Sequence, residues 1–169
     1  VDTRVMLAKD AKSPLPASGL RVAQPRDIEA LVSVARTAHT DSRFYADPRF
    51  PRARCDDFYE TWLRQSTRGF ADVVLVRDEG GVPRGYVTVV LHPASASATI
   101  GLLAVNPAFS RRSVGRRLVD GAIEWAASHG ADQINVATQG RNGGAQRFYH
   151  AAGFRPVTVS LQYHRWFGE

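Results

Sequence analysis

Cysteine is nearly absent from this chain of 169 residues, in which Cys55 is the only one. A single thiol cannot form a disulfide within the chain, and it cannot build a cysteine-based zinc cluster. The sequence therefore predicts neither a disulfide-stabilised fold nor a metal site.

Long apolar segments are also missing. No run approaches the roughly 18–20 apolar residues that cross a bilayer. The N-terminus lacks the basic start, apolar stretch and small-residue cleavage site of a signal peptide. We therefore expect a cytoplasmic protein without a membrane partner. The chain begins with Val1 rather than Met, which indicates a processed product or the end of a longer protein.

Acidic residues are outnumbered, with 16 Asp and Glu against 22 Lys and Arg, and the net charge is +6. Such a surface favours a polyanion, which could be nucleic acid, a phosphorylated cofactor or a nucleotide-sugar. The sequence carries no helix-turn-helix or RNP-type pattern, so nucleic acid is not the expected partner. An apolar content of 44% is ordinary for one globular domain with a core.

Strand and helix patterns alternate along most of the chain. Val1–Gly19 reads as a short strand and a linker, and residues 20–169 as one domain. Expected strands are Leu20–Ala23, Asp72–Arg77, Gly85–His92, Ala98–Val105, Gln133–Thr138 and Pro156–Phe167. Expected helices are one that Pro25 opens with Asp27 as its cap, Asp56–Ser66, Val114–His129 closed by Gly130, and Asn142–Ala152. This order predicts an α/β (α+β) fold, in which a mixed sheet carries helices on both faces.

The segment Ser110–Gly115 joins an expected strand to the start of a helix. Unpaired N–H groups and the positive end of the dipole at a helix start form a ready site for a phosphate or diphosphate. Four arginines lie in this segment or directly after it, Arg111, Arg112, Arg116 and Arg117. Taken alone, they suit an anion site or simply a solvated charged face.

This segment resembles motif A of the GNAT acetyltransferases, V-x-P-x-(Y/F)-(Q/R)-x-x-G-x-(G/A)-x-x-L. The matching residues are Val105, Pro107, Phe109, Gly115 and Leu118. Ser110 stands where Gln or Arg is usual, and Ser113 where the first Gly is usual.

A second segment, Asn142–Phe154, resembles motif B of the same family, N-x-x-A-x-x-x-Y-x-x-x-G-F. The matching residues are Asn142, Ala145, Tyr149, Gly153 and Phe154. By physical chemistry alone, Asn142 is a good helix cap and Tyr149 could be a core aromatic residue.

The two motifs together imply a GNAT fold and an acetyl-CoA-dependent N-acetyltransferase, in which an amine attacks the thioester directly. Tyr149 would be the general acid that protonates the leaving thiolate, and a backbone N–H of Leu103 or Ala104 would polarise the thioester carbonyl. The residues that the resemblance assigns to the cofactor are Leu103, Ala104, Val105, Arg111, Arg112, Ser113, Val114, Gly115, Arg116 and Asn142.

The general base is left open. Many relatives place a glutamate on the strand before motif A, but here that strand reads ATIGLLAV and has no carboxylate. The remaining possibilities are His164, His92, Asp41, Asp47, a chain of water molecules, or Tyr149 acting through water.

The acceptor side is expected between the first two helices. S-R-F-x-x-D, F-Y-x-x-W, G-Y-V-T, I-G-L-L-A-V and the ending Q-Y-H-R-W are similar to bacterial dTDP-fucosamine (dTDP-4-amino-4,6-dideoxygalactose) acetyltransferases. The resemblance implies the amine of a nucleotide-linked amino-deoxy sugar as acceptor, and it assigns to this substrate Ser42, Arg43, Phe44, Tyr59, Trp62 and His164. By spacing alone, Phe58 and Trp62 also suit core positions of their helix.

Three alternatives stay open at this point. A GNAT enzyme could acetylate a protein N-terminus, an amino acid or another small amine. The chain could bind acyl-CoA without catalysis, or it could bind nucleic acid through its arginine-rich loop. The oligomeric state is also open, with a homodimer among the options.

Overall fold

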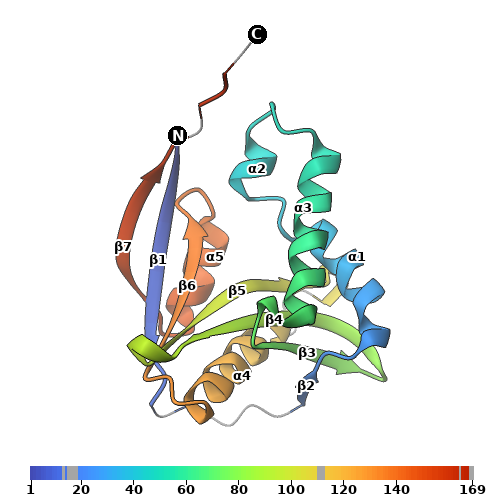
Figure 1. Ribbon diagram of the computed structural model, residues 1–169, viewed down its shortest axis with the longest axis vertical. Helices are drawn as coiled ribbons and strands as arrows, with labels where there is room; N and C mark the ends of the chain where they lie inside the picture. The colour runs from blue at the N-terminus through green and yellow to red at the C-terminus, as the bar shows by residue number, and fades with distance from the viewer. Residues whose placement is uncertain (13, 15–18, 110–112, 164, 168–169) are drawn as a thin grey trace.

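The computed structural model describes residues 1–12, 14, 19–109, 113–163 and 165–167 (Figure 1). Seven strands form one sheet in the order β2-β3-β4-β5-β6-β1-β7. The strands are β1 (Asp2–Asp10), β2 (Leu20–Val22), β3 (Val73–Glu79), β4 (Val82–His92), β5 (Ser97–Val105), β6 (Gln133–Gln139) and β7 (Arg155–Gln162). The helices are α1 (Ile28–Ala38), α2 (Arg43–Ala46), α3 (Arg52–Gln65), α4 (Val114–Ser128) and α5 (Gly143–Ala151).

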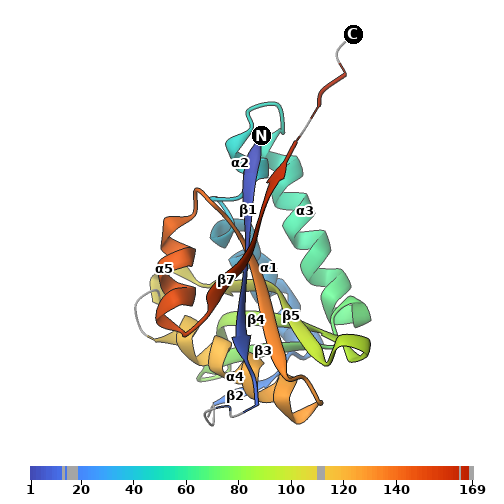
Figure 2. The same cartoon turned by 90° about the vertical axis from the view of Figure 1, so that its left-hand side faces the viewer.

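Helices cover both faces of the sheet (Figures 1 and 2). On one face α4 and α5 bury an apolar cluster that includes Leu118, Ile123 and Phe154. On the other face α1 and α3 bury a second cluster, which includes Leu31 and Leu63. The parallel pairing of β5 with β6 among antiparallel neighbours makes the sheet mixed. The predicted mixed sheet with helices on both faces is confirmed.

Strand β1 lies inside the sheet, antiparallel to β6 on one side and to β7 on the other (Figure 2). Its last pair with β7 joins Asp2 to Gln162. Among the described residues, β7 makes no further pair with β1 after Gln162. The prediction that the final strand runs to Phe167 is therefore wrong, since β7 ends at Gln162.

Two helix starts also differ from expectation. The Asp27 carboxylate does not cap α1, because it accepts hydrogen bonds from the Gln24 N–H at 2.7 Å and from the Arg21 guanidinium at 2.6 Å. Helix α3 begins at Arg52 rather than Asp56. The predicted role of Gly130 is confirmed, because it follows α4 with a φ of 85° that favours glycine.

The feature that positions the site is the divergence of β5 from β6. These strands pair only from Ser97 with Gln133 to Ile100 with Val136. Beyond that point β5 stays with β4 and β6 stays with β1, so the two halves of the sheet run apart (Figure 1). Backbone groups on the facing edges are left without strand partners, which is costly unless water or a ligand pairs with them.

Within the described residues, the structure contains no helix with the length and apolar character that crossing a membrane requires.

We predict that Phe154→Ala lowers the free energy of unfolding by about 3–5 kcal/mol, because the ring is fully buried and its removal leaves a cavity. Phe167→Ala is the matched control, since this ring is 85% exposed, and it should change stability by less than about 0.5 kcal/mol. Urea unfolding followed by circular dichroism measures both. Equal effects of the two variants would contradict the described core.

Candidate functional site

A cleft of about 760 Å³ opens where β5 and β6 diverge. One wall comes from the end of α1, from α2 and from α3, and the other from β6 and α5. Residues predicted separately for the acceptor and for the cofactor lie in this one cleft, namely Ser42, Arg43, Phe44, Tyr59, Trp62, Leu103, Asn142 and Tyr149. The structure therefore joins the two halves of the predicted site.

The α5 wall of the cleft contains two motif B residues, Asn142 and Tyr149. The Asn142 side chain caps α5 by accepting a hydrogen bond from the Ala145 N–H at 2.8 Å. Tyr149 is 6% exposed, and its ring packs against Phe148 and Phe154 with centroids 5.1 and 5.5 Å away. Burial raises the pKa of the Tyr149 phenol above its ordinary value, because the phenolate would lose its hydration. The phenol therefore stays protonated at neutral pH and suits a proton donor.

The β5 edge presents backbone N–H groups to the cleft. The Leu102 N–H donates toward β4, to the Thr88 hydroxyl at 2.8 Å, and the Asn106 N–H also donates toward β4, to the Arg84 carbonyl at 2.8 Å. Since N–H directions alternate along a strand, the Leu103 N–H points to the opposite edge, into the gap. Of the two donors that the resemblance left open, this geometry favours Leu103 over Ala104.

The α3 wall is aromatic. Tyr59 is 5% exposed, and its ring stacks on His39 at 4.4 Å and lies parallel to Trp62 at 6.4 Å. Phe58 is 41% exposed and lines the cleft, so the interpretation of Phe58 as a core residue is wrong. The Ser42 hydroxyl is buried beside the Tyr59 phenol, and it makes no hydrogen bond of ordinary geometry among the described residues.

His39 lines the cleft, and sequence reasoning missed it. Its Nε2 lies 3.4 Å from the hydroxyl of Tyr86, a fully buried residue of β4. Burial lowers the pKa of His39 to about 4, because the imidazolium would lose water without gaining a carboxylate. His39 is therefore uncharged at neutral pH. The sequence signal that could have pointed to His39 was Tyr86 in the motif G-Y-V-T, but the two residues are 47 positions apart.

Two arginines, Arg4 and Arg43, line the cleft. Arg43 donates to the Gln162 amide oxygen, and its guanidinium lies 4.8 Å from the centre of the Phe44 ring. Arg4, on β1, was not predicted. Among the described residues neither arginine forms an ion pair with a carboxylate. Their positive charges are therefore not balanced by a neighbouring side chain and can attract an anionic ligand.

The candidate bases are scattered. Asp41 lines the cleft. Asp47 is outside the cleft lining and accepts a hydrogen bond from Trp166 Nε1 at 3.1 Å. His92 is also outside it, but its Nε2 lies 3.0 Å from the hydroxyl of Thr99, which does line the cleft. His164 lies outside the described residues, as do Ser110, Arg111 and Arg112 of the cofactor loop.

The described part of that loop, from Ser113 onward, leads into α4 through an unusual backbone conformation. Ser113 has a φ of 56°, the left-handed conformation that explains a glycine at this position in the motif. Gly115 faces α5, since a side-chain carbon at this position would make an ordinary contact with the Phe148 ring at 3.4 Å. Arg116 is occupied, since it pairs with Asp120 at 2.9 Å and donates to the Ala151 carbonyl at 3.2 Å.

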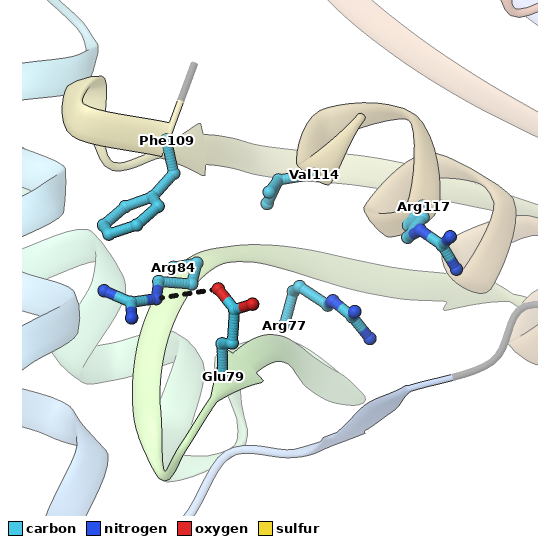
Figure 3. Close-up of a pocket in the computed structure, with 6 residues that line it drawn as sticks. All are labelled: Arg77, Glu79, Arg84, Phe109, Val114 and Arg117. Atoms are coloured by element: carbon cyan, nitrogen blue, oxygen red, sulfur yellow. Dashed lines mark ion pairs between the residues drawn. The ribbon is translucent and has the colours of Figure 1, made fainter. Parts of the chain in front are cut away.

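A smaller hollow of about 110 Å³ lies on the β3–β4 side of the α4 start (Figure 3). Arg77, Arg84 and Arg117 line it with one carboxylate, that of Glu79, whose oxygen is 3.6 Å from Arg84 Nε. The Arg84 guanidinium lies 3.7 Å from the centre of the Phe109 ring. These charges make the surroundings of the α4 N-terminus positive, which favours a phosphate-bearing ligand nearby.

The geometry agrees with the comparison to known proteins. Residues 34–154, well over half of the chain, match the acetyltransferase (GNAT) family. The chain belongs to the GNAT acetyltransferase family. Structurally, this GNAT chain is similar to an acetyltransferase of the same family from Colwellia psychrerythraea, with a TM-score of 0.69, 14% identity, and coverage of 93% of this chain and 53% of that one.

Two relatives are similar in sequence over most of this GNAT chain. The dTDP-fucosamine acetyltransferase of Escherichia coli O6:H1 is 37% identical over 151 residues, which cover 88% of this chain and 63% of that protein. The spore coat polysaccharide biosynthesis protein SpsD of Bacillus subtilis is 28% identical over 146 residues, which cover 86% of this chain and 50% of that protein. The chain thus spans between half and two-thirds of their lengths, and the predicted resemblance is confirmed.

We predict that His39 makes the protein less stable in acid. The unfolded chain takes up a proton near pH 6.5, whereas folded His39 does so only near pH 4, so stability is lost as the pH falls between these values. Allowing for its partial exposure, the loss from pH 7.5 to 5 is about 1–2 kcal/mol.

His39→Gln is the matched variant, because glutamine can still accept from the Tyr86 hydroxyl but does not titrate. Urea unfolding at pH 7.5 and 5 should show a smaller acid loss for this variant than for the native chain. The same loss in both proteins would contradict a buried, uncharged His39.

Proposed function

We propose that this chain transfers the acetyl group of acetyl-CoA to the amine of a nucleotide-linked amino-deoxy sugar. The observation that carries the proposal is the cleft at the divergence of β5 and β6, which Leu103 and Tyr149 line from two sides and an aromatic wall lines from the third. Family membership supports the acetyl transfer, and the relative named dTDP-fucosamine acetyltransferase supports the acceptor class.

The cofactor fits the described residues at two places. Acetyl-CoA supplies the acyl group as a thioester. The unpaired edges of β5 and β6 offer peptide groups to its amide-containing arm. Ser113, Val114 and Gly115 open α4, where backbone N–H groups suit the diphosphate. The arginines around the smaller hollow add positive charge beside this helix start.

The transfer requires the amine nitrogen to bond to the thioester carbon while the carbon–sulfur bond breaks. The Leu103 N–H donates a hydrogen bond to the carbonyl oxygen and stabilises the negative charge that develops there. Tyr149 gives its proton to the departing thiolate and recovers one from solvent. The proton that the amine loses passes to water, and uncharged His39 offers a hydrogen-bonding nitrogen without repelling the acceptor's cation.

The acceptor would carry negative charge of its own. Arg4 and Arg43 line the cleft, and Asp41 is the only carboxylate among the described lining residues, so this part of the cleft favours an anion. A diphosphate between nucleoside and sugar supplies such an anion. Trp62, Phe44 and the exposed face of Phe58 suit the flat or apolar faces of a base or a deoxysugar.

We predict that Tyr149→Phe lowers kcat about 10²–10⁴-fold, because the leaving thiolate loses its proton donor. The KM for acetyl-CoA should change little, since the ring and its packing remain. Tyr163→Phe is the matched control, because this tyrosine is 70% exposed and outside the cleft lining. Release of the coenzyme A thiol measures both. An unchanged kcat in Tyr149→Phe would refute the proton-donor role.

The acceptor is tested with a panel of amines under the same assay. A dTDP-4-amino-4,6-dideoxyhexose should have a kcat/KM at least about 100-fold above that of the free amino sugar, because the latter lacks the diphosphate. N-terminal peptides and amino acids complete the panel. Turnover of peptides without turnover of any nucleotide-sugar would contradict the proposed acceptor and favour a GNAT acting on N-termini.

Arg4→Gln sharpens this test. It should raise the KM for the nucleotide-sugar roughly tenfold while leaving the KM for acetyl-CoA unchanged, because only the acceptor's anion is affected. Arg68→Gln is the control, since Arg68 is exposed on another part of the surface and does not line the cleft. Equal KM values in both variants would remove Arg4 from the acceptor site.

A further inference from the structure

The pairing of β4 with β5 is interrupted beside the cleft. Val89 pairs with Ile100, but Val87 pairs with Leu103. One residue of β4, Thr88, therefore lies opposite two residues of β5, Gly101 and Leu102. This is a β-bulge, in which one strand carries an extra residue.

The bulge exchanges the two faces of β5. Before it, Ala98 and Ile100 pack into the cluster under α4 and α5. After it, Leu102 and Ala104 pack into the cluster under α1 and α3. Because the strand period is two residues, an uninterrupted ladder would also reverse the backbone directions, and the Leu103 N–H would point toward β4 rather than into the cleft.

The Thr88 side chain holds this irregularity in place. Thr88 is 1% exposed, and its hydroxyl oxygen accepts the Leu102 N–H at 2.8 Å in buried surroundings. The hydroxyl thus gives the buried Leu102 N–H an acceptor at the bulge, and its removal would cost the free energy of a buried hydrogen bond.

Gly101 completes the arrangement. A side-chain carbon at this position would lie 2.9 Å from the Thr88 hydroxyl oxygen and 3.9 Å from the Trp62 ring. The first distance is shorter than real contacts of this kind allow. The absence of a side chain at Gly101 therefore lets the Thr88 hydroxyl reach the Leu102 N–H.

We infer that Thr88 is a positioning residue for acetyl transfer, because its hydroxyl fixes the bulge that aims the Leu103 N–H into the cleft. Thr88 acts without contacting substrate, since it lies outside the cleft lining. The inference rests on the proposed function, in which the Leu103 N–H polarises the thioester carbonyl.

The test compares Thr88→Val with Thr88→Ser. Valine keeps the branched shape and removes the acceptor, whereas serine keeps the acceptor and removes a methyl group. Thr88→Val should lower kcat about 10–100-fold with little change in the KM for acetyl-CoA, since displacement of an oxyanion donor weakens the transition state more than binding. Thr88→Ser should retain kcat within about threefold of the native value.

Amide hydrogen exchange gives a readout that does not depend on activity. The Leu102 N–H should exchange at least about tenfold faster in Thr88→Val than in Thr88→Ser, because its acceptor is gone. If Thr88→Val does not fold, Thr88→Ala removes the hydroxyl without placing a methyl group against the amide, and the comparison with Thr88→Ser is repeated.

A kcat in the hydroxyl-free variant within about twofold of the native value would overturn the inference, and so would unchanged exchange at Leu102. Failure of the proposed function gives a different pattern. The native chain would then neither bind nor turn over acetyl-CoA, while the exchange of the Leu102 N–H would still respond to removal of the hydroxyl.

Discussion

The parting of β5 from β6 after Ile100 and Val136 is the constraint on which the site depends. Peptide groups in a sheet need hydrogen-bond partners, but beyond this point the facing edges of β5 and β6 are too far apart to bond to each other. A ligand with peptide-like amides can supply those partners, so under the proposed function the sheet edges would favour an extended, amide-containing ligand. The bulge at Thr88 belongs to the same constraint, because it decides which peptide groups of β5 face the opening.

The charge distribution of the cleft follows from its position between two apolar clusters. Its inner surface is uncharged, since burial keeps the Tyr149 phenol protonated and the His39 imidazole neutral. Positive charge is found where β1 and α2 meet the opening, at Arg4 and Arg43. Under the proposed function, an amine would reach Tyr149 without electrostatic repulsion, while Arg4 and Arg43 would hold the anionic part of the same molecule.

Sequence reasoning succeeded where chemistry is local. The cap at Asn142 and the left-handed Gly130 depend on neighbouring residues, so the local sequence predicts both. It failed where partners are distant. Strand β7 pairs with the distant strand β1, and the cleft residues Arg4 and His39 come from segments whose apposition no local pattern encodes. Thr88 was visible only as one letter of a motif, because its partner lies 14 positions away.

The central position of β1 has a consequence for the order of events during synthesis. Strand β1 precedes every other strand of this chain, yet it pairs only with β6 and β7, the last two. During synthesis β1 therefore cannot pair with β6 and β7 until more than a hundred further residues have emerged from the ribosome. The half of the sheet from β2 to β5 is free to assemble earlier from neighbouring segments. Arg4, which lies on β1, consequently reaches its place in the cleft only after β6 and β7 are available to pair with β1.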